Sequence, residues 1–128
     1  MKRKLFVLLI AAGFVASVRA HAHHSFAATY FEDKTGKIEG ELVQFIFRNP
    51  HSYVHVMARD EEGNIQRWAV EWTNGGQLGQ QGITRETLKP GDHVIVTGSP
   101  GRNPADHVLR MRTIERPADG WKWGGTFQ

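Results

Sequence analysis

Three histidines lie within four positions near the start of the chain, in the stretch RAHAHHSFAATY, at His21, His23 and His24. Imidazole nitrogens are the commonest protein ligands for transition metals. Several of them close together suit copper(II) in particular, because this ion favours a tetragonal field of nitrogen ligands. The histidines are therefore candidate copper ligands, and their chemistry depends on where the mature chain begins.

The residues before the histidines have the layout of a secretory signal peptide. Basic residues at positions 2–4 precede an apolar run from residue 5 to about residue 15, and small residues follow. The apolar run is shorter than the about 20 residues that cross a bilayer. We therefore expect a signal peptide over residues 1–22, cleaved after Ala20 or Ala22, and a protein exported to the bacterial periplasm without a transmembrane anchor.

The two cleavage sites predict two different sets of copper ligands. Cleavage after Ala22 makes His23 the first residue, so that its α-amino group and ring chelate one ion, and His24 or a distant histidine completes the site. Cleavage after Ala20 leaves His-Ala-His, in which the amine of His21, two backbone amides and the imidazole of His23 surround a square-planar ion. Both arrangements favour copper(II). The alternative is a solvated histidine-rich tail without a metal function.

A further candidate ligand follows the first predicted strand, in RNPHSYVHV. Asn49 and Pro50 predict a rigid turn that holds His51 at the start of a strand, at a rim of the domain where loops carry function. His55 lies about 13 Å further along the strand, too far for both rings to reach one ion. His51 is therefore the predicted partner of the N-terminal histidines, and the alternative is a histidine that hydrogen-bonds a turn.

Glu71 is a carboxylate inside an otherwise apolar predicted strand, on the face opposite to Trp68 and Trp72. A half-buried carboxylate needs a partner, because burying it alone is costly. One prediction is an ion pair with a residue such as Arg48 or Arg59. The other is a role as a metal ligand, or as the acceptor that orients a metal-binding histidine.

Composition excludes several classes of protein. Loss of the signal peptide removes four of the sixteen basic residues and leaves twelve against thirteen acidic ones, so we expect no binding of nucleic acid. The chain has no cysteine, which excludes disulfides and thiolate metal sites. No Ser-His-Asp order, no HExxH motif and no pair of carboxylates that suggests catalysis is recognisable in the sequence, so we expect that the protein is not an enzyme.

The mature chain is predicted to form one small β domain. Residues 23–36 have scattered aromatics without a helical period and are interpreted as an N-terminal arm on a barrel domain of residues 37–128. The segment KIEGELVQFIFRNP alternates and then shifts phase after Leu42, which indicates a bent or bulged strand near Gly40. The segment SYVHVMARDEEGNIQRWAVEW predicts a hairpin that turns at residues 60–64.

The second half of the domain predicts a short connection and further strands. The four glycines of TNGGQLGQQGI permit only a short, weak helix. A helical turn at residues 84–88, strands at about 93–98 and 107–115, and an edge strand in GWKWGGTF follow. This order predicts an all-β fold, a small five-stranded Greek-key barrel of OB type with one short helical connection; a β-sandwich is the alternative. The predicted core residues are Ile38, Leu42, Phe45, Val54, Val56, Trp68, Val70, Val94, Val96, Leu109 and Met111.

Several of these motifs together resemble a known family. The segments AHAHHSFAATY, FRNPHSYVHV, WAVEW and GITRETLKPGDHVIVTGSP are similar to the exported bacterial domain-of-unknown-function family 6152, from His23 to Ile114. The resemblance implies the family and no particular activity. The positions that match its shared elements are His23, His24, Ser25, Phe26, Asn49, Pro50, His51, Trp68, Val70, Glu71, Gly82, Thr84, Leu88, Lys89, Pro90, Gly91 and Asp92.

Two functional hypotheses from different classes follow. The first is a periplasmic copper-binding accessory protein that uses the mature N-terminus and His51. The second is a metal-free interaction module, in which an aromatic surface meets a periplasmic protein or a glycan. That surface would comprise Tyr53, Trp72, Trp121 and Trp123.

Overall fold

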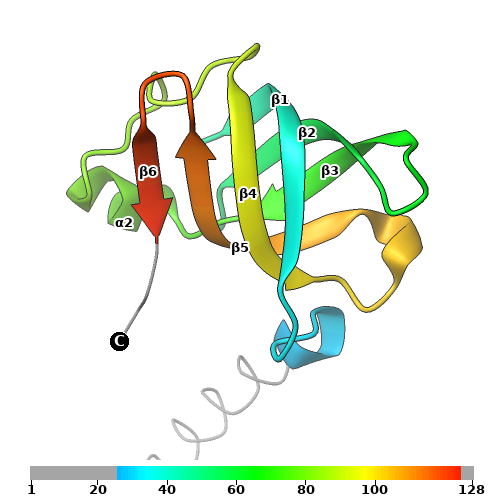
Figure 1. The fold of residues 1–128 in the computed structure, drawn as a ribbon. Helices are drawn as coiled ribbons and strands as arrows, with labels where there is room; N and C mark the ends of the chain where they lie inside the picture. Colours follow the sequence, from blue (N-terminus) through cyan, green and yellow to red (C-terminus); the bar gives the residue numbers. More distant parts are fainter. Residues whose placement is uncertain (1–25, 125–128) are drawn as a thin grey trace, which may run out of the picture.

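The computed structural model describes residues 26–124, whose strands and helices follow one another as Figure 1 shows. The elements are β1 (Gly36–Ile46), β2 (Tyr53–Arg59), β3 (Ile65–Glu71), α2 (Gly75–Gln80), β4 (His93–Pro100), η1 (Pro104–Asp106), β5 (Val108–Arg116) and β6 (Trp121–Gly124). The predicted hairpin, the last two predicted strands and the edge strand are therefore present. In this part of the chain, no helix is long and apolar enough to cross a membrane.

One parallel strand pair closes the sheet into a barrel. β1 is antiparallel to both β2 and β4, β2 is antiparallel to β3, and β4 is antiparallel to β5. β3 and β5 then pair in parallel over Ala69–Glu71 and Val108–Arg110. This closed order, with a short helix between β3 and β4, confirms the predicted five-stranded Greek-key barrel of OB type. β6 extends β5 as an antiparallel edge strand.

β1 bends so that it can pair with two neighbours on a closed barrel. Its register with β2 shifts between Leu42 and Gln44, at the place where the hydrophobic pattern changes phase. Gly40 lies against β2 so closely that a Cβ atom there would overlap the carbonyl oxygen of Met57. The predicted bulged strand is thus confirmed, and the glycine is needed for close approach of two backbones.

A single hydrophobic cluster fills the barrel. Nine of the eleven predicted core residues are buried, whereas Phe45 and Trp68 only pack against the cluster from its edge. The prediction missed buried side chains that come mostly from outside the regular alternation of the strands. These residues are Tyr30, Ala58, Trp72, Leu78, Ile83, Leu88 and Ile114.

The short helix α2 forms in spite of its glycines because its N-terminus is capped and its one large apolar side chain is buried. The side chain of Asn74 caps the helix by accepting a hydrogen bond from Gln77 N over 2.9 Å. Leu78 is fully buried. At Gly75 a Cβ atom would lie 3.0 Å from the ring of Phe47, so the glycine lets the helix lie close to the end of β1.

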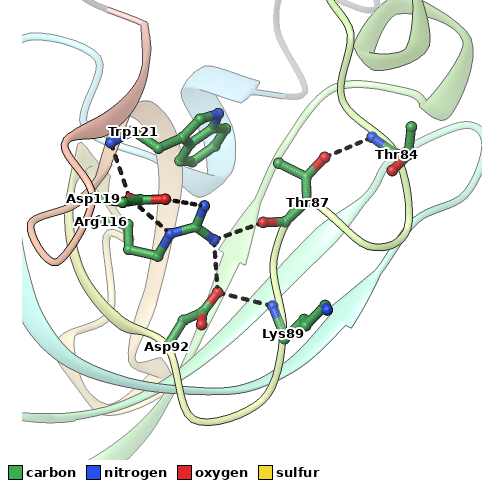
Figure 2. Close-up of polar contacts among 7 residues, drawn as sticks. All are labelled: Thr84, Thr87, Lys89, Asp92, Arg116, Asp119 and Trp121. Atoms are coloured by element: carbon green, nitrogen blue, oxygen red, sulfur yellow. Dashed lines mark hydrogen bonds and ion pairs between the residues drawn. The ribbon is translucent and has the colours of Figure 1, made fainter.

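Arg116, the last residue of β5, forms hydrogen bonds with three other parts of the chain (Figure 2). Its guanidinium group donates to the carboxylate of Asp92 over 2.9 Å, to the carbonyl oxygen of Thr87 over 2.7 Å and to both oxygens of Asp119 over 2.9 and 3.0 Å. Asp92 also accepts from Lys89 N. The connection that leads into β4 is therefore fixed to the β5–β6 turn by side-chain hydrogen bonds.

The residues before β1 lie against the connection between β4 and β5. Tyr30 forms an isolated bridge with Gly101, and Phe31 N donates to the carbonyl oxygen of Pro100 over 2.9 Å. Arg102 N in turn donates to the carbonyl oxygen of Thr29. Tyr30 is buried. The segment is thus held by backbone hydrogen bonds on both sides of a buried aromatic side chain.

Candidate functional site

His51 lies in the loop between β1 and β2, which a small set of hydrogen bonds shapes. The hydroxyl of Ser52 accepts from Arg48 N over 3.2 Å and donates to the carbonyl oxygen of Arg48 over 3.1 Å. The guanidinium of Arg48 donates to the carbonyl oxygen of His51. Because Ser52 is fully buried, this loop is anchored on the barrel, and it presents a half-exposed His51 ring at the rim.

Glu71, the last residue of β3, meets that ring. Its Oε1 lies 3.7 Å from His51 Nδ1, and its Oε2 accepts a hydrogen bond from the hydroxyl of Tyr30 over 2.7 Å. The predicted ion pair with Arg48 or Arg59 is wrong. Arg48 bonds the His51 carbonyl, and Arg59 donates to the carbonyl oxygen of Gly63 in the β2–β3 turn.

Two tyrosines surround the Glu71 carboxylate. Burial, and then the hydrogen bond to Glu71, raise the pKa of Tyr30 above its usual range. Burial and the negative charge of Glu71 likewise raise the pKa of Tyr53. Both phenols therefore stay protonated at physiological pH, so Tyr30 remains a donor to Glu71. This donor fixes one carboxylate oxygen and leaves the other facing His51.

The first described residue, Phe26, lies beside His51. The two rings meet edge to face with their centroids 6.2 Å apart, and the guanidinium of Arg110 lies 3.7 Å from the centroid of the Phe26 ring. Phe26, His51, Glu71 and Arg110 line a small pocket of about 160 Å³, together with Trp72. The start of the described chain is thus held at the same rim as His51 and Glu71.

The predicted ligands His21, His23 and His24 lie outside the described residues. Between residues 26 and 124, no three His, Asp or Glu side chains come together as a metal-binding group. His51 and Glu71 are therefore a pair of candidate groups that would need further ligands from elsewhere. The sequence offered no indication that Tyr30 or Arg110 belongs beside them, since both depend on contacts across the barrel.

The predicted aromatic surface is not continuous. Trp72 is buried, with 4% of its surface exposed, and its ring packs against those of Phe45 and Trp123 at centroid distances of 5.9 and 5.0 Å. Trp121 and Trp123 also pack against the core. Trp72 was expected at the surface because sequence alone did not place β6 across the end of β3.

Comparison with known proteins gives a family and no activity. The model of a family of unknown function, DUF6152, matches residues 12–110, which is most of the chain. This range includes every residue of the rim described above, as well as the three N-terminal histidines. The search of curated proteins returned no match.

Proposed function

We propose a function for this chain, which belongs to the family of unknown function DUF6152: it is an exported periplasmic protein that binds copper(II) between its N-terminal histidines and His51. The observation that carries this proposal is the contact of Phe26 with His51 at the rim of the barrel. The protein would act as an accessory that holds the ion, and not as an enzyme.

Chain length supports a shared site. One residue spans at most about 3.6 Å, so His24 lies within about 7 Å of Phe26 along the chain and His23 within about 11 Å. Phe26 is itself in ring contact with His51. The N-terminal imidazoles and the α-amino group of a chain that begins at His23 are therefore within reach of an ion bound to His51.

The surroundings of His51 suit a metal ligand. Glu71 lies on the Nδ1 side of the ring, where a carboxylate favours a proton on that nitrogen. Nε2 then carries the free lone pair and can bind a metal. A carboxylate behind a histidine is the usual way in which proteins orient such a ligand, and Tyr30 holds Glu71 in this position.

The donor set favours copper(II) over zinc. A terminal amine and two or three imidazoles supply only nitrogen ligands, which suit the tetragonal geometry of copper(II) and its place at the top of the affinity order of divalent metals. The sequence has no cysteine, which zinc sites often use. The metal-free interaction module is less favoured, because burial of Trp72 divides the aromatic surface on which it relied.

The test uses the exported protein with its natural start. Intact mass first identifies the N-terminal residue. Copper(II) and zinc are then titrated calorimetrically against a competing chelator, into this protein and into a variant with one additional N-terminal methionine. We expect one copper(II) per chain, bound more tightly than zinc, and a strong loss of affinity in the variant, because a displaced amine no longer chelates beside the first histidine.

The result separates the proposal from its alternatives. The variant His51→Ala should weaken binding, and should do so less if cleavage follows Ala20, because His-Ala-His then surrounds the ion without it. Equal copper affinity in the native and the Met-extended proteins would show that the histidines form only a solvated tail that binds copper non-specifically. Cleavage well beyond His24 would remove the proposed site altogether.

A further inference from the structure

The outer edge of β3 is paired along only part of its length. The parallel pair with β5 begins at Ala69, whose N–H donates to the carbonyl oxygen of His107 over 3.0 Å. Before Ala69, no strand among residues 26–124 pairs with this edge, although β2 pairs with the other edge throughout. The first half of β3, from Ile65 to Trp68, therefore has a free edge.

The alternation of hydrogen bonds identifies which backbone groups point outward. Trp72 N donates to the carbonyl oxygen of Ser52 on the side of β2, whereas Ala69 N donates to the side of β5. Backbone groups alternate between the two edges of a strand. Ile65 and Arg67 therefore direct their N–H and C=O groups away from β2. Such an unpaired row is a template for a further strand.

A groove of about 570 Å³ lies at this part of β3, where Gln66 and Trp68, the residues that alternate with Ile65 and Arg67, line it. Its apolar lining includes Phe31, Trp68 and Val108, and residues of the connection between β4 and β5 also line it. Figure 1 shows this connection next to β3. The Trp68 ring is held in place, because its Nε1 donates to the carbonyl oxygen of Ala58 over 3.3 Å and the His107 ring packs edge-on at 5.2 Å. The groove thus offers a fixed aromatic surface next to free backbone groups.

The charged lining of the groove is mainly acidic. The β2–β3 turn contributes Asp60, Glu61 and Glu62, whereas the segment before β1 contributes Lys34, whose ammonium group lies 4.0 Å from the centroid of the Phe31 ring. Asp60 accepts hydrogen bonds from the turn itself. Within the described part of the chain, no partner holds the carboxylates of Glu61 and Glu62. A basic side chain bound in the groove would therefore meet complementary charge.

We propose that this groove binds an extended, basic peptide segment of a protein partner, which adds a strand to β3 from Ile65 to Trp68. Outward backbone groups of Ile65 and Arg67 would supply the hydrogen bonds, and the acidic turn would select for lysine or arginine. The site is separate from the copper site, because β3 carries Ile65 and Glu71 at opposite ends, about 20 Å apart.

Amide hydrogen exchange tests directly whether a bound peptide adds a strand to β3. The probe is a synthetic peptide of eight residues that alternates lysine with valine, titrated into the mature protein and followed by NMR. We expect the amides of Ile65 and Arg67 to exchange freely at first and to become at least about tenfold slower in the complex. The amides of Gln66 and Trp68, which already face β2, should change little and serve as internal controls.

A proline at the edge provides the matched variant. Arg67→Pro removes an outward N–H and leaves the hydrogen bonds to β2 intact, whereas Arg67→Ala keeps this N–H. Both variants lose the side-chain bonds from Arg67 to His55 and Gln44. We expect the proline to weaken peptide binding at least about tenfold and the alanine less than about twofold.

A modified peptide keeps the test valid if the proline variant fails to fold. In a bound strand, every second peptide amide faces β3. N-methylation of these amides should abolish binding, whereas N-methylation of the other set should leave it unchanged. An equal loss of affinity in the two N-methylated peptides would overturn the proposal. So would unchanged amide exchange at Ile65 and Arg67 in the presence of millimolar lysine–valine peptide. Equal affinity for a glutamate–valine peptide would overturn the choice of a basic partner.

Discussion

The exchange of Glu71 for glutamine probes the proposed copper site with the smallest change of shape. In the native protein, the Tyr30 hydroxyl donates to Oε2 over 2.7 Å, and Oε1 faces His51 Nδ1 at 3.7 Å. Glutamine has only one oxygen. Because Tyr30 stays protonated and requires an acceptor, the oxygen of glutamine will face Tyr30 and its NH₂ group will face His51.

This reversal changes the tautomer of His51. An NH₂ donor opposite Nδ1 favours the form that has its lone pair on Nδ1 and its proton on Nε2. Nε2 is then unable to bind a metal until it loses that proton. Removal of the group that orients a metal-binding histidine costs 10- to 100-fold in affinity, or about 1.4–2.8 kcal/mol. We expect Glu71→Gln to weaken copper(II) binding by this amount.

The barrel provides a matched control. His93 Nε2 and Glu39 Oε1 form a second histidine–carboxylate pair, 2.9 Å apart, and both side chains are more than half exposed. Glu39→Gln changes the same chemical group without a contact to the arm. Copper(II) affinity of the three proteins is measured against a competing chelator, and the fluorescence of Trp72 and Trp123, which line the pocket with His51, reports binding near this rim.

Two results would refute the reasoning. Unchanged copper affinity in Glu71→Gln would show that the carboxylate does not orient a ligand. An equal fall in Glu39→Gln would show that the histidines of the barrel bind copper without selection. Thermal unfolding of each variant without metal separates a loss of affinity from a loss of the fold.

Three further predictions concern the barrel itself. Arg116→Ala should lower the free energy of unfolding by about 2 kcal/mol in chemical denaturation, because the bonds to Asp92, Asp119 and the Thr87 carbonyl are lost together. The hydrogen bond from Arg116 lowers the pKa of Asp119. This carboxylate therefore stabilises the fold above its unfolded pKa of about 3.9 and ceases to do so as the pH falls through its folded pKa. In Asp119→Asn, the melting temperature should consequently fall less steeply at acid pH than in the native protein. Gly40→Ala should cost more than about 3 kcal/mol or prevent folding, as circular dichroism would reveal, because its Cβ would overlap a carbonyl oxygen of β2.

The strands were predictable because their signals are local. Alternation set the inward face of β2 and β4, and the change of phase after Leu42 located the bulge in β1. The β2–β3 turn was predictable for a similar reason, since Asp60 accepts hydrogen bonds from Glu62 N and Asn64 N within the same short segment.

The residues that the prediction misjudged depend on contacts between distant segments. Trp72 is buried because the ring of Trp123, about fifty residues later in the chain, packs on it with the two ring centroids 5.0 Å apart. Glu71 was expected to pair with an arginine, but its hydrogen-bond partner is Tyr30, 41 residues earlier. Charge and alternation along one strand contain no information on which segment will cross its end, so such partners become visible only in the fold.

The rim therefore couples two parts of the molecule that the sequence suggests separately. Tyr30 joins the N-terminal segment to Glu71, Glu71 faces His51, and Phe26 packs between His51 and Arg110. Any ligand that bridges the N-terminal histidines and His51 would add a bond between the same two parts. By linkage, the ligand would stabilise the docked arm, and the docked arm would in turn raise the affinity for the ligand. In the proposed copper site, the buried Tyr30 of the arm would therefore contribute to metal binding through Glu71, although a tyrosine beside a carboxylate does not by itself indicate such a role.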